Sequence, residues 1–280
     1  MVVRPAGTIT IQPMTYTAQS YVLHEATYRQ MLEHRPNLAV LPWGATEAHN
    51  YHLPHGTDVI EANALGTAAV QRACEAKAKC VVLPCVPFGM NHTQLGQVAT
   101  ITMRASTQLA VLRDVAESLV RQHIDRLVVL NFHGGNELKP LIRDVMLDLP
   151  IFILQVHGYK IAPQIRELLD MPDGDHADEF ETSLMLHLQP GWVAPLETAG
   201  PGTPTPSKLP AVSGTPGVWA SRNWPAASAD TGIGDPRQAT AEKGKHIFKM
   251  LVDALVPVLV ELSQAKPGDF PFVIGQDGEV

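Results

Sequence analysis

The sequence predicts a three-layer α/β/α fold with a central, mostly parallel sheet. Short apolar runs rich in Val, Ile and Leu alternate along the chain with longer segments of helical periodicity. A repeated strand, helix, strand order forms right-handed crossovers, which set neighbouring strands parallel. The chain has 280 residues, 45% hydrophobic and 18% charged, so it can bury a sizeable core. At about 150 residues per domain, this length by itself favours two domains over one, although α/β domains of about 200–250 residues are common.

The predicted strands are brief and bounded by Pro or Gly; they cover residues 38–41, 81–83, 127–131 and 151–156. The predicted helices cover residues 61–76, 106–123, 137–148, 179–188 and 238–264. Within 106–123, Leu109, Leu112, Val115 and Leu119 recur at helical spacing, with charged residues elsewhere. Such an apolar stripe is typical of a helix packed on a sheet.

Residues 196–236 differ from the rest, because they contain seven prolines among many Gly, Ser and Thr. Proline lacks a backbone donor, so the segment favours a long loop over helix or sheet. A loop of this length is uncommon unless it serves a site or an interface. The sequence has no internal repeat, no GxGxxG and no GxxxxGK[ST], so no motif supports a nucleotide site.

Composition excludes several classes of function. The formal charge of −7 argues against a nucleic-acid surface, which needs a basic stripe. Three cysteines without a CxxC argue against a disulfide scaffold or a thiolate zinc site. The first seven residues do not resemble a signal peptide, and no apolar run has the length of a membrane span, so we expect a cytoplasmic protein. The 12 histidines are the unusual feature of the composition.

Histidines and carboxylates gather where predicted strands end, which is where α/β sheets bind ligands. Glu47 and His49 follow the first strand two residues apart, which puts both on one side of an extended segment. His133 follows the third strand, and a later segment carries His176 and Glu181. We expect the fold to bring these side chains together.

Asp58 stands just before the predicted helix at 61–76, where an aspartate is often only an N-cap. Imidazole and carboxylate ligands together also suit divalent cations such as Zn²⁺ and Mn²⁺. Five such ligands with one shared carboxylate would suit two ions about 3.5–4 Å apart. Spacing alone leaves both interpretations of Asp58 open.

Four motifs, in order over about residues 38–250, resemble the creatininase (creatinine amidohydrolase) family. The first, Gly44-Ala-Thr-Glu47-Ala-His49-Asn-Tyr-His52-Leu-Pro-His-Gly-Thr57-Asp58, is similar to that family's first strand end throughout. The others are Asn131-Phe-His133-Gly-Gly-Asn136, His176-Ala177-Asp-Glu-Phe-Glu181-Thr182-Ser183, and the run from Gly232 to Gly244 with its Gly-Asp-Pro.

The resemblance implies one domain over residues 1–280, with 196–236 as a loop segment inside it. It also implies a homo-oligomer, often a hexamer, and two divalent ions per chain, with Zn²⁺ expected first and Mn²⁺ or Fe²⁺ as alternatives. Glu47 and His133 would hold one ion and His49 the other. Asp58 would bridge both, and Glu181 would complete the second site.

The implied reaction is hydrolysis by a hydroxide that the two metals activate, with attack on a carbonyl and with His176 as general acid or base. The expected substrate is a small polar cyclic amide or formamide, and the expected enzyme is an amidohydrolase acting on C–N bonds other than peptide bonds. Two alternatives stay open: C–C ring opening of a cyclic keto-polyol, and a catalytically silent binding or assembly protein on the same fold.

Departures from creatininase proper argue against creatinine itself. Gly134 and Gly135 stand where that enzyme has Tyr-Glu, which makes Glu181 more necessary as a ligand. Pro172 and Asp173 stand where it has Trp-Asp, so its aromatic lid over creatinine is missing. Other branches of the family act on formamides or trim a modified peptide.

Candidate substrate contacts lie beside these motifs, and they are Asn91, His92, Gly134 and Asp173. His52 and His55 are interpreted as polar groups around the entrance, and Trp43 as packing beneath the site. Trp219 and Trp224, in the Pro-rich segment, either replace the missing lid or belong to the core or a subunit interface. Cys85 is interpreted as a small apolar residue without a catalytic role.

Overall fold

The computed structural model describes residues 18–270, so the prediction about the first seven residues lies outside the described part. Its sheet has four parallel strands in the order β2-β1-β3-β4. The strands are β1 (Leu38–Trp43), β2 (Cys80–Val82), β3 (Arg126–Asn131) and β4 (Phe152–His157). Strand β1 is central and pairs along its full length with β3, from Leu38 opposite Arg126 to Trp43 opposite Asn131.

The helices that alternate with these strands are α1 (Tyr28–His34), α2 (Thr57–Glu75), α3 (Ala105–Arg121) and α4 (Leu138–Asp148). The helices that follow β4 are α5 (Glu179–Leu188), α6 (Pro210–Gly214), α7 (Trp224–Ala227) and α8 (Ala241–Gln264). Short 3₁₀ helices are η1 (His92–Gln94), η2 (Gly158–Lys160), η3 (Pro163–Leu168), η4 (Pro190–Trp192), η5 (Leu196–Thr198) and η6 (Pro267–Asp269). None of the helices in residues 18–270 combines the length and apolar character needed to cross a membrane.

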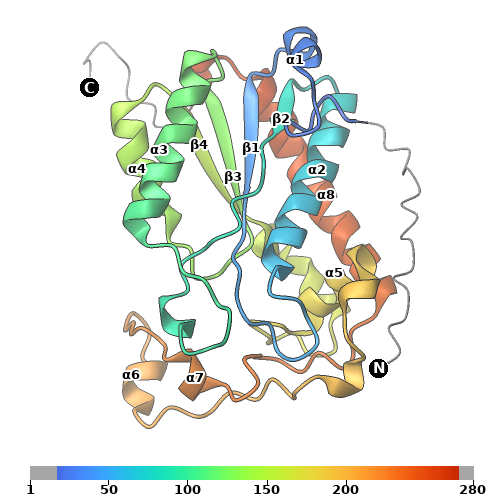
Figure 1. Ribbon diagram of the computed structural model, residues 1–280, viewed down its shortest axis with the longest axis vertical. Helices are drawn as coiled ribbons and strands as arrows, with labels where there is room; N and C mark the ends of the chain where they lie inside the picture. The colour runs from blue at the N-terminus through green and yellow to red at the C-terminus, as the bar shows by residue number, and fades with distance from the viewer. Residues whose placement is uncertain (1–17, 271–280) are drawn as a thin grey trace, which may run out of the picture.

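Helices cover both faces of the sheet, with α3 and α4 on one side and α2 and α8 on the other (Figure 1). The strands alternate their side chains between these two layers. Leu38 and Val40 of β1 join the apolar core beneath α2 and α8, whereas Ala39 and Leu41 join the core beneath α3 and α4. The structure therefore confirms the predicted three-layer α/β fold.

Two helix starts differ from the sequence prediction. Helix α2 begins at Thr57 rather than residue 61, and Gly56 is its N-cap, so the interpretation of Asp58 as an N-cap was wrong. Gly56 has no side chain that could cap the helix, so no N-cap residue marks this start in the sequence, and the predicted start came too late. Helix α8 begins at Ala241 rather than 238, because Thr240 caps it and accepts a hydrogen bond from the Lys243 amide.

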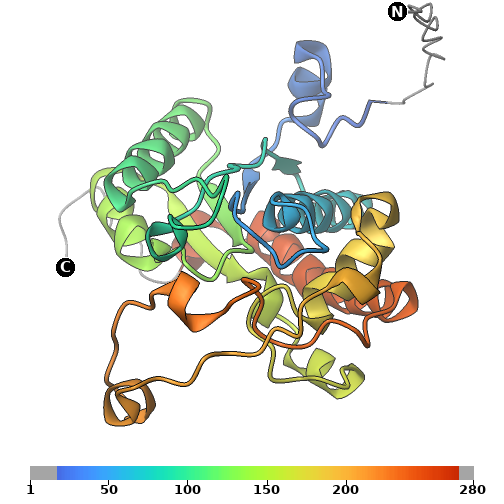
Figure 2. The same ribbon diagram turned by 60° about the horizontal axis from the view of Figure 1, so that its bottom comes forward.

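The Pro-rich segment has little regular structure, as predicted, apart from η5, α6 and α7. Residues 203–223, here called the arm, are exposed without exception. Figure 2 shows the part that carries α6 extending away from the rest of the chain. The base of the arm is held by backbone hydrogen bonds from Thr205 to Ala227 (2.7 Å) and from Gly234 to Gly202 (2.9 Å).

The carboxyl edge of the sheet gathers the loops that carry the sequence motifs. Because β1 and β3 are parallel neighbours, the segments that follow Trp43 and Asn131 leave the sheet at the same edge. The loops after the strands, the start of α2 and the arm all lie at this end (Figures 1 and 2).

Candidate metal centre

Six ionisable side chains meet at this edge, and we call them the polar cluster: Glu47, His49, Asp58, His133, His176 and Glu181. Five of them are buried, with exposed fractions between 1% and 6%, and Glu181 is half-buried. Burying this many charged or titratable groups costs free energy unless they are paired or bind a cation. Their arrangement therefore needs a specific explanation.

The loop after β1 brings Glu47 and His49 against the first turn of α2, which carries Asp58. Gly44 permits this approach, because a Cβ there would lie only 2.7 Å from the Val59 amide nitrogen. The N-terminus of α2 also favours the ionised form of Asp58 through the helix dipole.

His133 follows β3 and is held by a similarly tight turn. Its Nε2 donates to the carbonyl oxygen of Met90 at 3.2 Å. A Cβ at Gly135 would lie 2.5 Å from both of these atoms, so any larger residue would disrupt this hydrogen bond. This contact gives a physical reason for the second glycine of the Asn131-Phe-His133-Gly-Gly motif.

Asp58 lies between two groups of ligand atoms. Its Oδ2 lies 3.1 Å from Nδ1 of His133, which is also 3.0 Å from Oε1 of Glu47. Its Oδ1 lies 2.8 Å from Nε2 of His49, which is 3.9 Å from Oε2 of Glu181. Each group of three offers ligand atoms within 4.8 Å of one another, so each could hold one ion, with Asp58 common to both.

The imidazoles are oriented by backbone carbonyls behind them. Nδ1 of His49 donates to the carbonyl of Glu47 at 3.0 Å, and Nε2 of His176 donates to the carbonyl of Ala48 at 2.8 Å. His133 does the same with the carbonyl of Met90. In all three rings, one nitrogen therefore donates to a backbone carbonyl, and the other nitrogen faces the carboxylates. This is the outer hydrogen bonding that metal-ligating histidines use to fix their tautomer.

Burial and mutual charge shift the pKa values within the cluster strongly. Burial alone would lower the pKa of His49, but the carboxylates of Asp58, Glu181 and Glu47 raise it to about 10. Burial raises the pKa of Glu181 to about 8. The neighbouring His49 lowers this pKa, whereas the carboxylates of Asp178 and Asp58 raise it further. Burial and the neighbouring His49 lower the pKa of His176, so its ring is neutral near pH 7.

The donor set fits a pair of divalent cations. An oxygen of Glu47, an oxygen of Asp58 and Nε2 of His49 are buried without a partner in hydrogen-bonding geometry. The ligand atoms of each group lie within 4.8 Å of one another, and mixed imidazole and carboxylate ligands suit Zn²⁺ or Mn²⁺. Glu47, His49 and His176 form a third possible group, since Nδ1 of His176 lies 3.8 Å from Oε1 of Glu47.

The segment that follows the arm contacts His176 directly. The indole of Trp224 packs edge-on against the His176 ring, with centroids 5.2 Å apart, and its Nε1 donates to the carbonyl of Thr231. The Arg222 guanidinium lies 4.5 Å from the centre of the same indole and pairs with Asp175 at 2.8 Å. Trp224 is buried, so of the two tryptophans it is the one held at the site, whereas Trp219 is 86% exposed.

A cavity of about 2090 Å³ lies between the polar cluster, η2, η3 and the arm. Of the predicted substrate contacts, His92 and Gly134 line it, and Asn91 and Asp173 do not. Asn91 is buried, and its amide donates to the carbonyls of Ile101 and Thr46, which holds the loops together.

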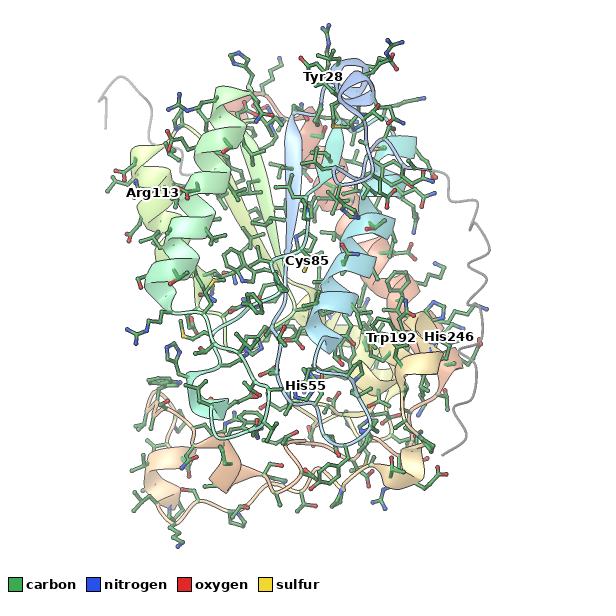
Figure 3. All side chains as sticks on the ribbon, in the orientation of Figure 1. Tyr28, His55, Cys85, Arg113, Trp192 and His246 are labelled. Atoms are coloured by element: carbon green, nitrogen blue, oxygen red, sulfur yellow. The ribbon has the colours of Figure 1, made fainter. Side chains whose placement is uncertain are left out.

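The other singled-out side chains lie around the site rather than in it. His52 is buried and lies 2.8 Å from the Thr182 hydroxyl, whereas His55 is half-buried and contacts the Val98 carbonyl. Figure 3 shows His55 in the loops below the sheet and Cys85 closer to the strands. Trp43 is fully buried at the end of β1, as predicted for packing beneath the site.

Sequence reasoning missed Glu61, which is fully buried one turn after Asp58 on α2. Neither of its carboxylate oxygens has a hydrogen-bond partner. Burial raises its pKa well above the ordinary value, and Glu181, Asp58 and Asp178 raise it further. The i, i+3 spacing from Asp58 on one helix face was the available signal.

Comparison with known proteins agrees with these observations. The family model described as creatinine amidohydrolase matches residues 23–259. A relative named mycofactocin precursor peptide peptidase, from Mycobacterium tuberculosis, is 32% identical over 246 residues, which is 84% of this chain and 88% of that protein.

Solved structures show the same fold. A putative creatinine amidohydrolase from Bacteroides fragilis superposes with a TM-score of 0.83 at 33% identity, covering 89% of this chain and 99% of that one. A mutant creatininase of the Zn-Zn type superposes with a TM-score of 0.71 at 21% identity, covering 89% of this chain and all of the other.

Proposed function

This chain is a hydrolase of the creatininase family, and we propose that it uses two divalent cations at the polar cluster to hydrolyse an amide bond. The observation that carries the proposal is Asp58, whose two oxygens lie 2.8 and 3.1 Å from imidazole nitrogens of two different ligand groups. Glu47 and His133 would hold one ion, and His49 and Glu181 the other. Zn²⁺ is the first expectation, with Mn²⁺ or Fe²⁺ as alternatives.

The bound cations would supply Lewis acidity, which polarises the scissile carbonyl and lowers the pKa of water. His176 would exchange a proton at Nδ1, because its Nε2 is already engaged with Ala48. Its lowered pKa leaves the ring neutral near pH 7, so it can accept a proton and later deliver it to the leaving nitrogen. Trp224 and His49, which both contact this ring, would hold it in place.

For the substrate, we propose an amide bond within a peptide or a peptide-derived molecule. The cavity of about 2090 Å³ supports this, because pockets for small ligands typically have volumes of about 300–1,000 Å³. The peptidase name of the Mycobacterium tuberculosis relative points the same way. A small cyclic amide or formamide, which the sequence alone favoured, would leave most of this space unfilled.

The proposal is tested by measuring turnover of the metal-loaded protein on four kinds of compound. These are peptide mixtures analysed by mass spectrometry, creatinine and other lactams, formamides, and cyclic keto-polyols. We expect cleavage of peptides that stops when a chelator removes the metal. Turnover of small amides or keto-polyols alone would overturn the peptide assignment, and a protein with two bound ions and no turnover would support the binding-protein alternative.

A further inference from the structure

Besides Arg222, which pairs with Asp175, the walls of the cavity outside the polar cluster carry four exposed cations: Arg104, Lys160, Arg166 and Lys208. None of the four takes part in an ion pair within residues 18–270. They come from three separate parts of the chain: the start of α3, the η2 and η3 segment, and the arm. Their positive charges therefore surround the cavity from several sides.

The carboxylates that line the same cavity are mostly engaged elsewhere. Three of the six belong to the polar cluster. Asp178 caps α5 by accepting from the Glu181 amide, and Asp175 pairs with Arg222. Among these lining carboxylates, only Glu137 neither belongs to the polar cluster, nor caps a helix, nor forms an ion pair. The outer wall is thus net positive, although the chain as a whole carries a formal charge of −7.

The arm adds an apolar surface to this positive wall. Leu209, Val212, Val218 and Trp219 all line the cavity, and all four are exposed. Exposed apolar side chains gathered over a cavity indicate a surface that a ligand covers. An occupant that fits must therefore present carboxylates and apolar side chains together.

We propose that the cavity binds an acidic, apolar-bearing peptide segment, whose carboxylates pair with Arg104, Lys160 and Arg166 while its apolar side chains pack under the arm. The inference rests on the proposed function, because it specifies the substrate class of that same site. Carboxylates of Asp or Glu side chains and a C-terminal carboxylate share the chemistry that these cations recognise. Arginine and lysine in separate positions suit several carboxylates spread along an extended chain.

The test is isothermal titration calorimetry of the zinc-loaded protein with matched hexapeptides. One peptide alternates Glu and Leu with a free C-terminus, a second is its C-terminally amidated form, and a third replaces every Glu by Gln. We expect the Glu peptide to bind about tenfold more tightly than the Gln peptide at low salt, and added salt to reduce the difference. The amidated peptide separates side-chain carboxylates from the C-terminal one.

The variant that carries Arg104→Gln, Lys160→Gln and Arg166→Gln should lose this preference for the Glu peptide. A charge-matched control, Lys79→Gln, Arg143→Gln and Lys245→Gln, removes exposed cations outside the cavity and should keep it. Equal affinity for the Glu and Gln peptides, or an equal loss in both variants, would overturn the proposal. So would a dimer by light scattering that binds none of the peptides, because a second copy would then cover the arm.

Binding and turnover are measured separately, so this inference and the proposed function can fail independently. A protein that prefers acidic peptides without cleaving any amide would contradict the hydrolytic proposal and retain the binding site. A protein that cleaves peptides regardless of their charge would support the hydrolytic proposal and contradict the preference for acidic peptides.

Discussion

The polar cluster and the arm face each other across one cavity, and they differ in how their side chains are held. Each imidazole of the cluster is fixed by a backbone carbonyl 2.8–3.2 Å behind it. In the arm, every residue from 203 to 223 is exposed, and the attachments lie at its two ends. A rigid site suits chemistry that needs fixed distances, whereas an exposed segment can adapt to varied substrates.

The largest effect should follow substitution of the carboxylate common to both ligand groups. We expect Asp58→Ala to lose both ions and at least about a thousandfold in turnover, since Lewis-acid stabilisation is worth several kcal/mol. Metal content by mass spectrometry and turnover of the same samples measure this. Asp114→Ala, an exposed aspartate on α3, is the control. Retention of two ions in Asp58→Ala would show that Asp58 does not bridge.

The next comparison separates ligands from the proton-transfer group within the cluster. His133→Ala should lose metal, whereas His176→Ala should keep it and lose turnover by about 10²–10⁴-fold, the usual contribution of general acid–base catalysis. The same two assays apply. If His176→Ala lost metal as His133→Ala does, His176 would be a ligand, as its nearness to Glu47 and His49 permits.

Trp224 lies at the boundary between the two regions, so it tests whether the arm influences the chemistry. Trp224→Ala removes the edge-on contact with His176, and we expect kcat to fall by about tenfold with unchanged metal content. Trp224→Phe should recover most of the loss, because an aromatic ring can restore the contact. Trp219→Ala, in the exposed arm, should change KM rather than kcat; equal kcat losses in both variants would contradict this division.

The smallest predicted effect concerns the stability of the metal-free cluster. Burial holds the pKa of Glu61 above its ordinary value, and nearby carboxylates add to the effect. As pH rises from 5 to 8, Glu61 ionises readily in the unfolded chain and reluctantly in the folded one, so the wild type loses stability. Glu61→Gln cannot ionise, so it should melt at a higher temperature than the wild type, by a margin that grows with pH.

Thermal melts of the metal-free proteins at pH 5 and pH 8 measure this margin, at about 2–4 °C per kcal/mol for a chain of this size. Glu75→Gln, an exposed glutamate on the same helix, should show no such dependence on pH. A margin for Glu61→Gln that is the same at both values would mean that Glu61 ionises as easily in the folded chain as in the unfolded one.

Much of the fold followed from local pattern, because buried strands and amphipathic helices have distinct periods. The four strands were predicted within a few residues, and α3 within two residues at each end. The start of α2 was missed because its N-cap, Gly56, has no capping side chain to mark it. Glu61 was missed because, on sequence alone, a glutamate in a helix is expected to face solvent.

The sequence by itself determined the alternation of strands and helices, the candidate ligands and the family resemblance, because these depend on residue order and local spacing. Only the tertiary structure decided that Asp58 lies between His49 and His133, that Trp224 rather than Trp219 contacts His176, and that unpaired cations surround one cavity. Each of these facts joins residues distant in the chain, so each depends on how the parallel sheet aligns its loops at one edge.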